Sequence, residues 1–141
     1  MNSKPLLALT AQATTFRVAD TEPPLEEVSE TGGGQYDGVP VRFLYTVRVT
    51  PGADVDRIGG NGILYAKGAR APFRISGEAA GGPDFSERVR GTGTFGPDCT
   101  GRLVELSDTK VWFRTAVDPS GQSATTVWRD AEQAPRAPTS R

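Results

Sequence analysis

Apolar and polar residues alternate along several short runs of this chain. The clearest run covers residues 88–95, and its two faces would carry Val89, Gly91, Gly93 and Phe95 on one side and Arg88, Arg90, Thr92 and Thr94 on the other. A period of two is typical of a β-strand with one buried face. The sequence therefore predicts a strand here, then a turn at 96–98, where Gly and Pro interrupt the pattern, and a second extended run over 103–106.

The same alternation predicts most of the remaining strands. The candidates cover residues 6–19, 39–50, 62–67, 72–79, 109–117 and 123–129. Turn residues separate them at a spacing of roughly 8–15 residues, and we find no convincing helical pattern. About eight strands arranged in this way predict an all-β fold, either a sandwich or a barrel. We favour a single antiparallel up-and-down β-barrel of the calycin-like type, because closing the sheet removes its edges and leaves room for one small ligand.

Two segments depart from the strand pattern. Residues 20–38 are polar and contain Pro23-Pro24 and Gly32-Gly33-Gly34, which predicts a mobile loop that is either a lid or simply disordered. Residues 131–141 are rich in Pro, Ala and Arg and are expected to form a flexible tail. A length of 141 residues suits one domain, so we expect residues 1–141 to form a single β-barrel domain.

Gly91, Gly93 and Gly96 also match the spacing G-x-G-x-x-G of dinucleotide-binding loops. That motif functions between a strand and a helix, whereas these glycines lie inside a predicted strand and Pro97-Asp98 follows them. We therefore interpret them as positions where a small closed sheet bends sharply.

Composition and charge exclude several function classes. The chain has 16 Lys and Arg against 17 Asp and Glu, so no basic excess favours a nucleic-acid partner. It has no His and one Cys, which excludes the usual zinc site, a Ser-His-Asp triad and a Cys-His dyad, and we expect neither a metal nor another cofactor. The lack of a Cys framework, of a signal-peptide core and of a long apolar segment predicts a cytoplasmic protein without membrane contact.

Residues 89–95, the turn after them and Gly101-Arg102-Leu103 resemble the glycine-rich hairpin of the allene oxide cyclase and dirigent β-barrels. The likeness extends over about residues 40–129, although Arg90-Gly91 stands where the plant proteins carry a Gly pair. Bacterial natural-product pathways use small barrels of this class, including spirotetronate cyclases, as stand-alone cyclases. By analogy, the resemblance implies a cyclase of polyketide-type natural-product biosynthesis, such as a Diels-Alderase that performs a [4+2] cycloaddition or a related ring closure.

Aromatic residues on the apolar strand faces are the candidate site. The predicted substrate-binding residues are Phe43, Phe73, Ile75, Phe95, Phe113 and Trp128. Tyr45 and Tyr65 are the predicted catalytic residues, because a hydroxyl can polarise a substrate carbonyl while the lumen holds the reacting ends together. Core packing is the alternative for each of these residues. A small apolar substrate or ligand is the expected partner.

Three functions remain open from the sequence: a cofactor-independent cyclase, which we favour, a lipocalin-like carrier of a small apolar molecule, and an accessory subunit with a filled core. Trp112 lies between Lys110 and Arg114 on a polar face, which suggests a homodimer through the outer surface of the barrel. Glu78 and Glu87 are expected on a solvated outer face, and Cys99 is not expected to be reactive.

Overall fold

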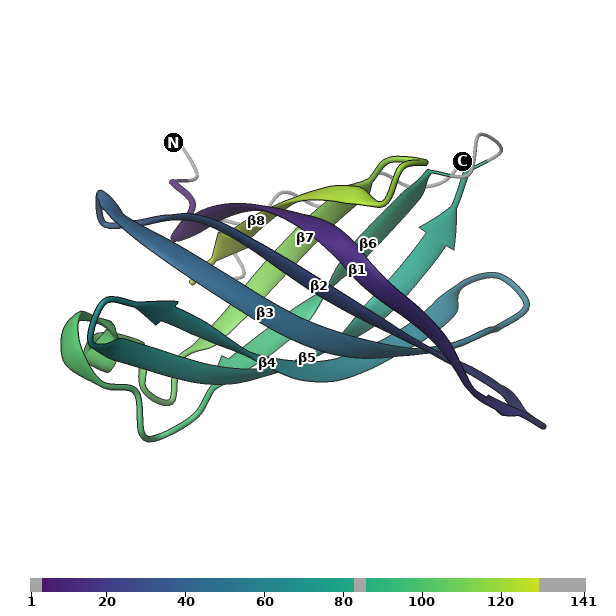
Figure 1. Cartoon of the computed structure of the whole chain (residues 1–141), viewed down its shortest axis with the longest axis horizontal. Helices are drawn as coiled ribbons and strands as arrows, with labels where there is room; N and C mark the ends of the chain where they lie inside the picture. The colour runs from purple at the N-terminus through teal and green to yellow at the C-terminus, as the bar shows by residue number, and fades with distance from the viewer. Residues whose placement is uncertain (1–3, 83–85, 130–141) are drawn as a thin grey trace.

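The computed structural model describes residues 4–82 and 86–129, and these form a closed antiparallel β-barrel in which each strand pairs with the next and the last pairs with the first (Figure 1). The all-β, up-and-down barrel prediction is confirmed. The strands are β1 (Leu7–Thr21), β2 (Pro24–Tyr36), β3 (Val39–Thr50), β4 (Asp56–Ala66), β5 (Ala69–Gly81), β6 (Glu87–Phe95), β7 (Lys110–Val117) and β8 (Gln122–Trp128), and a 3-10 helix, η1 (Gly101–Leu106), lies between β6 and β7.

The prediction of a loop over residues 20–38 is wrong, because most of this segment is strand β2. Its three consecutive glycines lie in the strand, where neighbouring backbone comes very close. A Cβ atom on Gly32 would overlap the carbonyl oxygen of Thr10 on β1. The glycines are therefore required by close strand packing and are not a sign of flexibility. The tail predicted over residues 131–141 lies outside the described residues.

The prediction of an extended run over residues 103–106 is also wrong, because these residues belong to η1. Leu103 and Leu106 are three positions apart, so a helix with three residues per turn puts both on one face. Both are 0% exposed, whereas Val104 between them is 58% exposed. The helix packs against β5 and β4 and buries its two leucines in the core cluster.

The two ends of the barrel therefore differ. At the end that holds η1, which we call the plugged end, the turns β2–β3, β4–β5 and the β6–β7 connection come together, and β1 begins there. At the opposite end, the open end, the turns β1–β2, β3–β4 and β7–β8 surround the lumen, and β5 ends and β6 begins there (Figure 1). A ligand can reach the lumen only where side chains leave space, and η1 fills the plugged end.

The interpretation of the 91–96 glycines as a bend is supported at Gly91. A Cβ atom there would overlap the carbonyl oxygen of Ser76 on β5 and lie 2.8 Å from the Cα atom of Gly77. Gly91 is paired with Gly77 across the two strands, so two residues without side chains allow β5 and β6 to approach closely. The close approach lets the sheet curve sharply at this point, which helps to close eight strands into a narrow barrel.

Candidate functional site

A cavity of about 380 Å³ runs through the barrel, and all eight strands contribute to its lining. Its walls are mainly apolar, and its volume lies within the range of about 300–1,000 Å³ that is typical of small-molecule sites. Leu64 and Phe95 line it near the plugged end, and Phe16 and Pro119 line it at the open end. Since β-strand side chains alternate between the two faces, every second residue of a regularly paired strand faces this lumen.

Six of the predicted site residues lie together in this cavity: Phe43, Tyr45, Phe73, Ile75, Phe95 and Phe113. Phe43 and Tyr45 are two positions apart on β3, and their rings stack with centroids 5.4 Å apart. Phe73 and Phe95 pair across β5 and β6 with an edge-on contact at 6.0 Å. The aromatic lining follows directly from the alternation of apolar residues in the sequence.

The other two predicted site residues lie outside the cavity. Tyr65 follows Leu64 on β4, and because Leu64 faces the lumen, Tyr65 belongs to the opposite face. Trp128 follows the lumenal Val127 on β8 in the same way; it is 6% exposed, and its indole nitrogen has no hydrogen-bond partner within the described part of the chain. The structure therefore does not place the predicted catalytic residue Tyr65 or the predicted substrate-binding residue Trp128 in the cavity.

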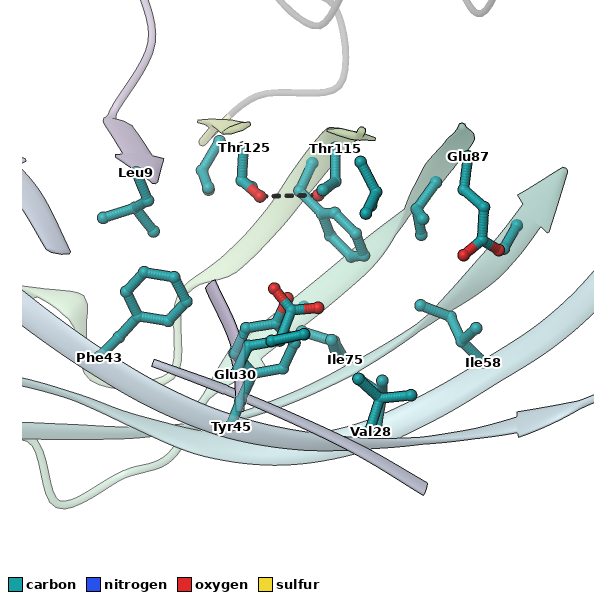
Figure 2. Close-up of a pocket in the computed structure, with 18 of the residues that line it drawn as sticks. Leu9, Val28, Glu30, Phe43, Tyr45, Ile58, Ile75, Glu87, Thr115 and Thr125 are labelled. Atoms are coloured by element: carbon teal, nitrogen blue, oxygen red, sulfur yellow. Dashed lines mark hydrogen bonds between the residues drawn. The ribbon is translucent and has the colours of Figure 1, made fainter. Parts of the chain in front are cut away.

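A buried carboxyl group at the centre of the lumen was not predicted. Glu30 on β2 is 8% exposed and lines the cavity. Its Oε1 atom accepts a hydrogen bond of 3.0 Å from the Ser123 hydroxyl, and the Tyr45 hydroxyl lies beside the same carboxyl group and favours its ionised form. Figure 2 shows Glu30 beside Tyr45, surrounded by apolar side chains. The three residues form a polar cluster, the Glu30 cluster, in a mainly apolar cavity.

The strand register explains how the Glu30 cluster assembles. Glu30 lies opposite Tyr45 on β3 and opposite Ala13 on β1. The neighbouring Ala11 of β1 pairs with Ser123 on β8. Because β1 carries only small alanine side chains at these two positions, the Glu30 side chain can cross over β1 and reach the Ser123 hydroxyl.

Burial changes the acidity of the Glu30 cluster. Removal from water raises the pKa of Glu30, and the hydrogen bond from Ser123 and the neighbouring Tyr45 hydroxyl only partly oppose this effect. The charge of Glu87 raises it further. Burial also raises the pKa of the Tyr45 hydroxyl. The charge of Glu30 and the interaction of the hydroxyl with that carboxyl group raise it further, by smaller amounts. Tyr45 therefore stays a hydrogen-bond donor, while the Glu30 carboxyl holds its proton more readily than an exposed one.

Two further polar features line the cavity. Thr115 on β7 and Thr125 on β8 pair directly, and their hydroxyl oxygens are 2.7 Å apart (Figure 2). Glu87 lines the cavity nearer the open end, and burial, together with the charges of Asp56 and Glu26, raises its pKa. Glu87 is exposed to solvent, as predicted, but it lines the cavity, so the prediction that it lies on the outer face of the barrel is wrong. Glu78 is exposed and lies 3.6 Å from Arg90, in agreement with the prediction.

The sequence contained a signal for one of the missed residues. Glu87 has the same parity as Val89 and Phe95, so it shares their inward face. Glu30 carried no such signal, because its segment was assigned to a loop. Ser123 lies on the same strand face as Thr125 and Val127, but a small hydroxyl side chain does not show by itself whether that face is buried.

Two remaining candidates, Cys99 and Trp112, have plain structural roles. Cys99 is buried, its thiol lies 3.5 Å from the Gly96 carbonyl oxygen, and burial raises its pKa, which disfavours the reactive thiolate. Trp112 is half-buried, and the Lys110 ammonium lies 5.2 Å from its ring centroid. Over residues 4–82 and 86–129, no group of three or more His, Cys, Asp or Glu side chains is arranged to hold a metal ion. The same residues contain no helix with the length and hydrophobicity needed to cross a membrane.

The fold and the cavity define the class of this protein: a small, closed, eight-stranded antiparallel β-barrel with a ligand-sized apolar lumen and a buried carboxyl group at its centre. No protein-family model, curated protein or solved structure matches the chain.

Proposed function

We propose that this protein is a cofactor-independent cyclase that folds a linear, unsaturated, polyketide-type substrate in its lumen for a [4+2] or related ring closure. The Glu30 cluster is the observation that carries the proposal. A carboxyl group in an apolar cavity, with a pKa raised by burial, is typical of a site that donates a hydrogen bond to a reacting group.

The proposed mechanism has two parts. The narrow aromatic lumen holds the two reacting ends of the substrate next to each other in the right orientation, which lowers the entropic part of the activation barrier. Protonated Glu30 donates a hydrogen bond to a substrate carbonyl, which draws electron density from the conjugated π-system and stabilises charge that develops during ring closure. Ser123 and Tyr45 hold the carboxyl group in place. No net proton transfer is needed, because new bonds form between substrate carbons.

A carrier function is the second candidate, and one observation favours it. Several polar groups deep in the lumen are paired with one another, in the Glu30 cluster and in the Thr115–Thr125 pair. An apolar molecule can therefore occupy the cavity without leaving these groups unsatisfied, and needs no chemistry to do so.

Incubation with linear polyene-tetronate candidates tests the two functions against each other. A cyclase accelerates ring closure over buffer; Glu30→Gln, which keeps a donor, retains part of the rate, and Glu30→Leu loses it. An apolar fluorescent dye measures binding in the same samples. Dye binding at a defined stoichiometry without acceleration of any candidate would assign the carrier function, and failure to bind any apolar probe would reject both.

A further inference from the structure

Strand β1 changes the face that it presents to the lumen at Thr14. Before this residue the odd positions Leu7, Leu9 and Ala13 line the cavity. The pairing of β1 with β2 shifts by one between Ala13 and Thr15, which is a β-bulge with Thr14 as the extra residue. Beyond the bulge, the even position Phe16 lines the cavity.

The bulge determines that Phe16, and not the charged Arg17, faces the lumen. Without it, the odd-numbered Arg17 would follow Ala13 on the lumenal face. With it, Arg17 points to the other face, where its guanidinium lies 3.2 Å from the Glu27 carboxylate. Glu27 also pairs with Arg48 at 3.0 Å. The charged network therefore lies outside, and the ring of Phe16 lies on the side where a ligand would be bound.

Few protein atoms shield the Phe16 side chain from solvent. It is 71% exposed although it lines the cavity, and Val18, at the next position of the same parity, is 66% exposed. The pairing of β8 with β1 ends at Gln12, so both residues lie on the part of the β1–β2 hairpin that extends past β8 at the open end (Figure 1). A large apolar side chain that continues a cavity wall and stays exposed is typical of a surface that a bound molecule covers.

The cavity is long and narrow. Leu9 and Phe16 both line it and are seven residues apart, which corresponds to about 18 Å along a barrel whose strands tilt by about 40°. A volume of about 380 Å³ distributed over this length leaves a small cross-section. The cavity therefore fits an extended molecule better than a compact one.

We infer that Phe16 and Val18 form a rim subsite that covers the distal apolar part of an elongated ligand, and that Phe16 thereby sets the ligand length that the barrel favours. This inference rests on the proposed function only in that the lumen binds a small apolar molecule, as a cyclase or as a carrier. The occupant is the same molecule that fills the lumen, because the cavity wall is continuous from Leu9 to Phe16.

Displacement of a bound apolar dye by linear primary alcohols, from hexanol to hexadecanol, tests the rim subsite. In the unmodified protein, affinity should rise about fourfold for each added methylene until the chain outgrows the surface that covers it. Phe16→Ala should bind the short alcohols unchanged and the longest ones about tenfold more weakly. Phe16→Leu should fall between the two. Leu44→Ala, at a residue that is 50% exposed on β3 and does not line the cavity, is the matched control.

The possible outcomes separate the two claims. If the unmodified protein binds neither dye nor alcohol, the proposed function fails. If it binds them and Phe16→Ala keeps the same dependence on chain length, the rim subsite alone is rejected. A molecular mass in solution that falls from dimer to monomer on Phe16→Ala would instead show that a second copy of the chain covers Phe16, and would overturn the inference. Because Phe16 is exposed, its replacement should leave the thermal unfolding midpoint nearly unchanged, which confirms that folding is intact.

Discussion

Glu30 and Ser123 are 93 positions apart in the chain, and their side chains meet through a hydrogen bond of 3.0 Å in the middle of the lumen. The contact crosses β1 at its alanine residues and links β2 to β8, the strand that closes the barrel. Formation of this site therefore requires the completed barrel. The same closure excludes water from the carboxyl group and raises its pKa.

The buried carboxyl group should make stability depend on pH. Because the pKa of Glu30 is raised in the folded protein, its contribution to the free energy of unfolding is fully present below the ordinary value of 4.5 and is lost as pH rises through the folded value. Glu30→Gln keeps an acceptor for Ser123 and removes the ionisation. We expect this variant to lose less stability than the unmodified protein as pH rises. Urea unfolding from about pH 4 to about pH 8 measures the difference.

Glu78→Gln is the control for this measurement, because Glu78 is exposed and pairs with the exposed Arg90. Its pH dependence should follow that of the unmodified protein. Glu87 also has a raised pKa, but the burial that raises it is common to all three proteins, so the comparison reports mainly on Glu30. An identical pH dependence for Glu30→Gln and the unmodified protein would contradict an ionisable, buried Glu30.

Removal of the Tyr45 hydroxyl should raise the pKa of Glu30 further. The Tyr45 hydroxyl favours the ionised carboxylate, and Tyr45→Phe removes that hydroxyl while it keeps the stacked ring. We expect a loss of about 1 kcal/mol in stability and, if the cyclase proposal holds, a slower turnover. Titration of the ¹³C-labelled Glu30 carboxyl by NMR gives the pKa directly.

Tyr65→Phe is the matched control for Tyr45→Phe, because Tyr65 lies on the face opposite to the lumenal Leu64. It should change neither the pKa of Glu30 nor the rate. An equal effect of both replacements would mean that the Tyr45 hydroxyl has no specific contact with the carboxyl group.

The sequence predicted the barrel and its aromatic lining better than the polar residues inside the lumen. Alternation along β3 and β6 was sufficient to identify Phe43, Tyr45 and Phe95 as lumenal, because the period of two is set by local strand geometry. Glu30 could not be found in this way, since a polar segment with three glycines has the composition of a loop. Only the approach of β1, which a Cβ atom on Gly32 would obstruct, explains why that composition forms a strand.

Bulges and helical turns limited the prediction for a related reason. The inward face of β1 changes at Thr14, so strict alternation from Leu7 onward would assign Arg17 to the lumen in place of Phe16. Leu103 and Leu106 fit an extended run as well as a 3-10 turn when the sequence is considered alone. The packing of η1 against β4 and β5 decides between these conformations, and this contact is not local in sequence.

The plug formed by η1 should be essential to stability. Leu106 is 0% exposed, so Leu106→Ala should cost roughly 2–5 kcal/mol through lost burial and an unfilled cavity. Val104, in the same helix, is 58% exposed, and Val104→Ala should change stability by less than about 0.5 kcal/mol. Chemical unfolding of the two variants measures both values, and similar effects would mean that η1 does not seal the barrel.

The glycine pair of β5 and β6 should control barrel closure. A Cβ atom on Gly91 would overlap the backbone of Ser76, and backbone cannot move aside as a flexible side chain can. Gly91→Ala should therefore destabilise the protein by more than about 2 kcal/mol, despite the lower entropy of its unfolded chain. Gly59 on β4 is the matched control, because a Cβ atom there has its nearest neighbour, the carbonyl oxygen of Ile75, at 3.9 Å. Gly59→Ala should leave stability unchanged or raise it by about 0.5 kcal/mol. Thermal and urea unfolding of both variants compare the two positions, and equal stabilities would refute the close approach of β5 and β6 as the reason for glycine at position 91.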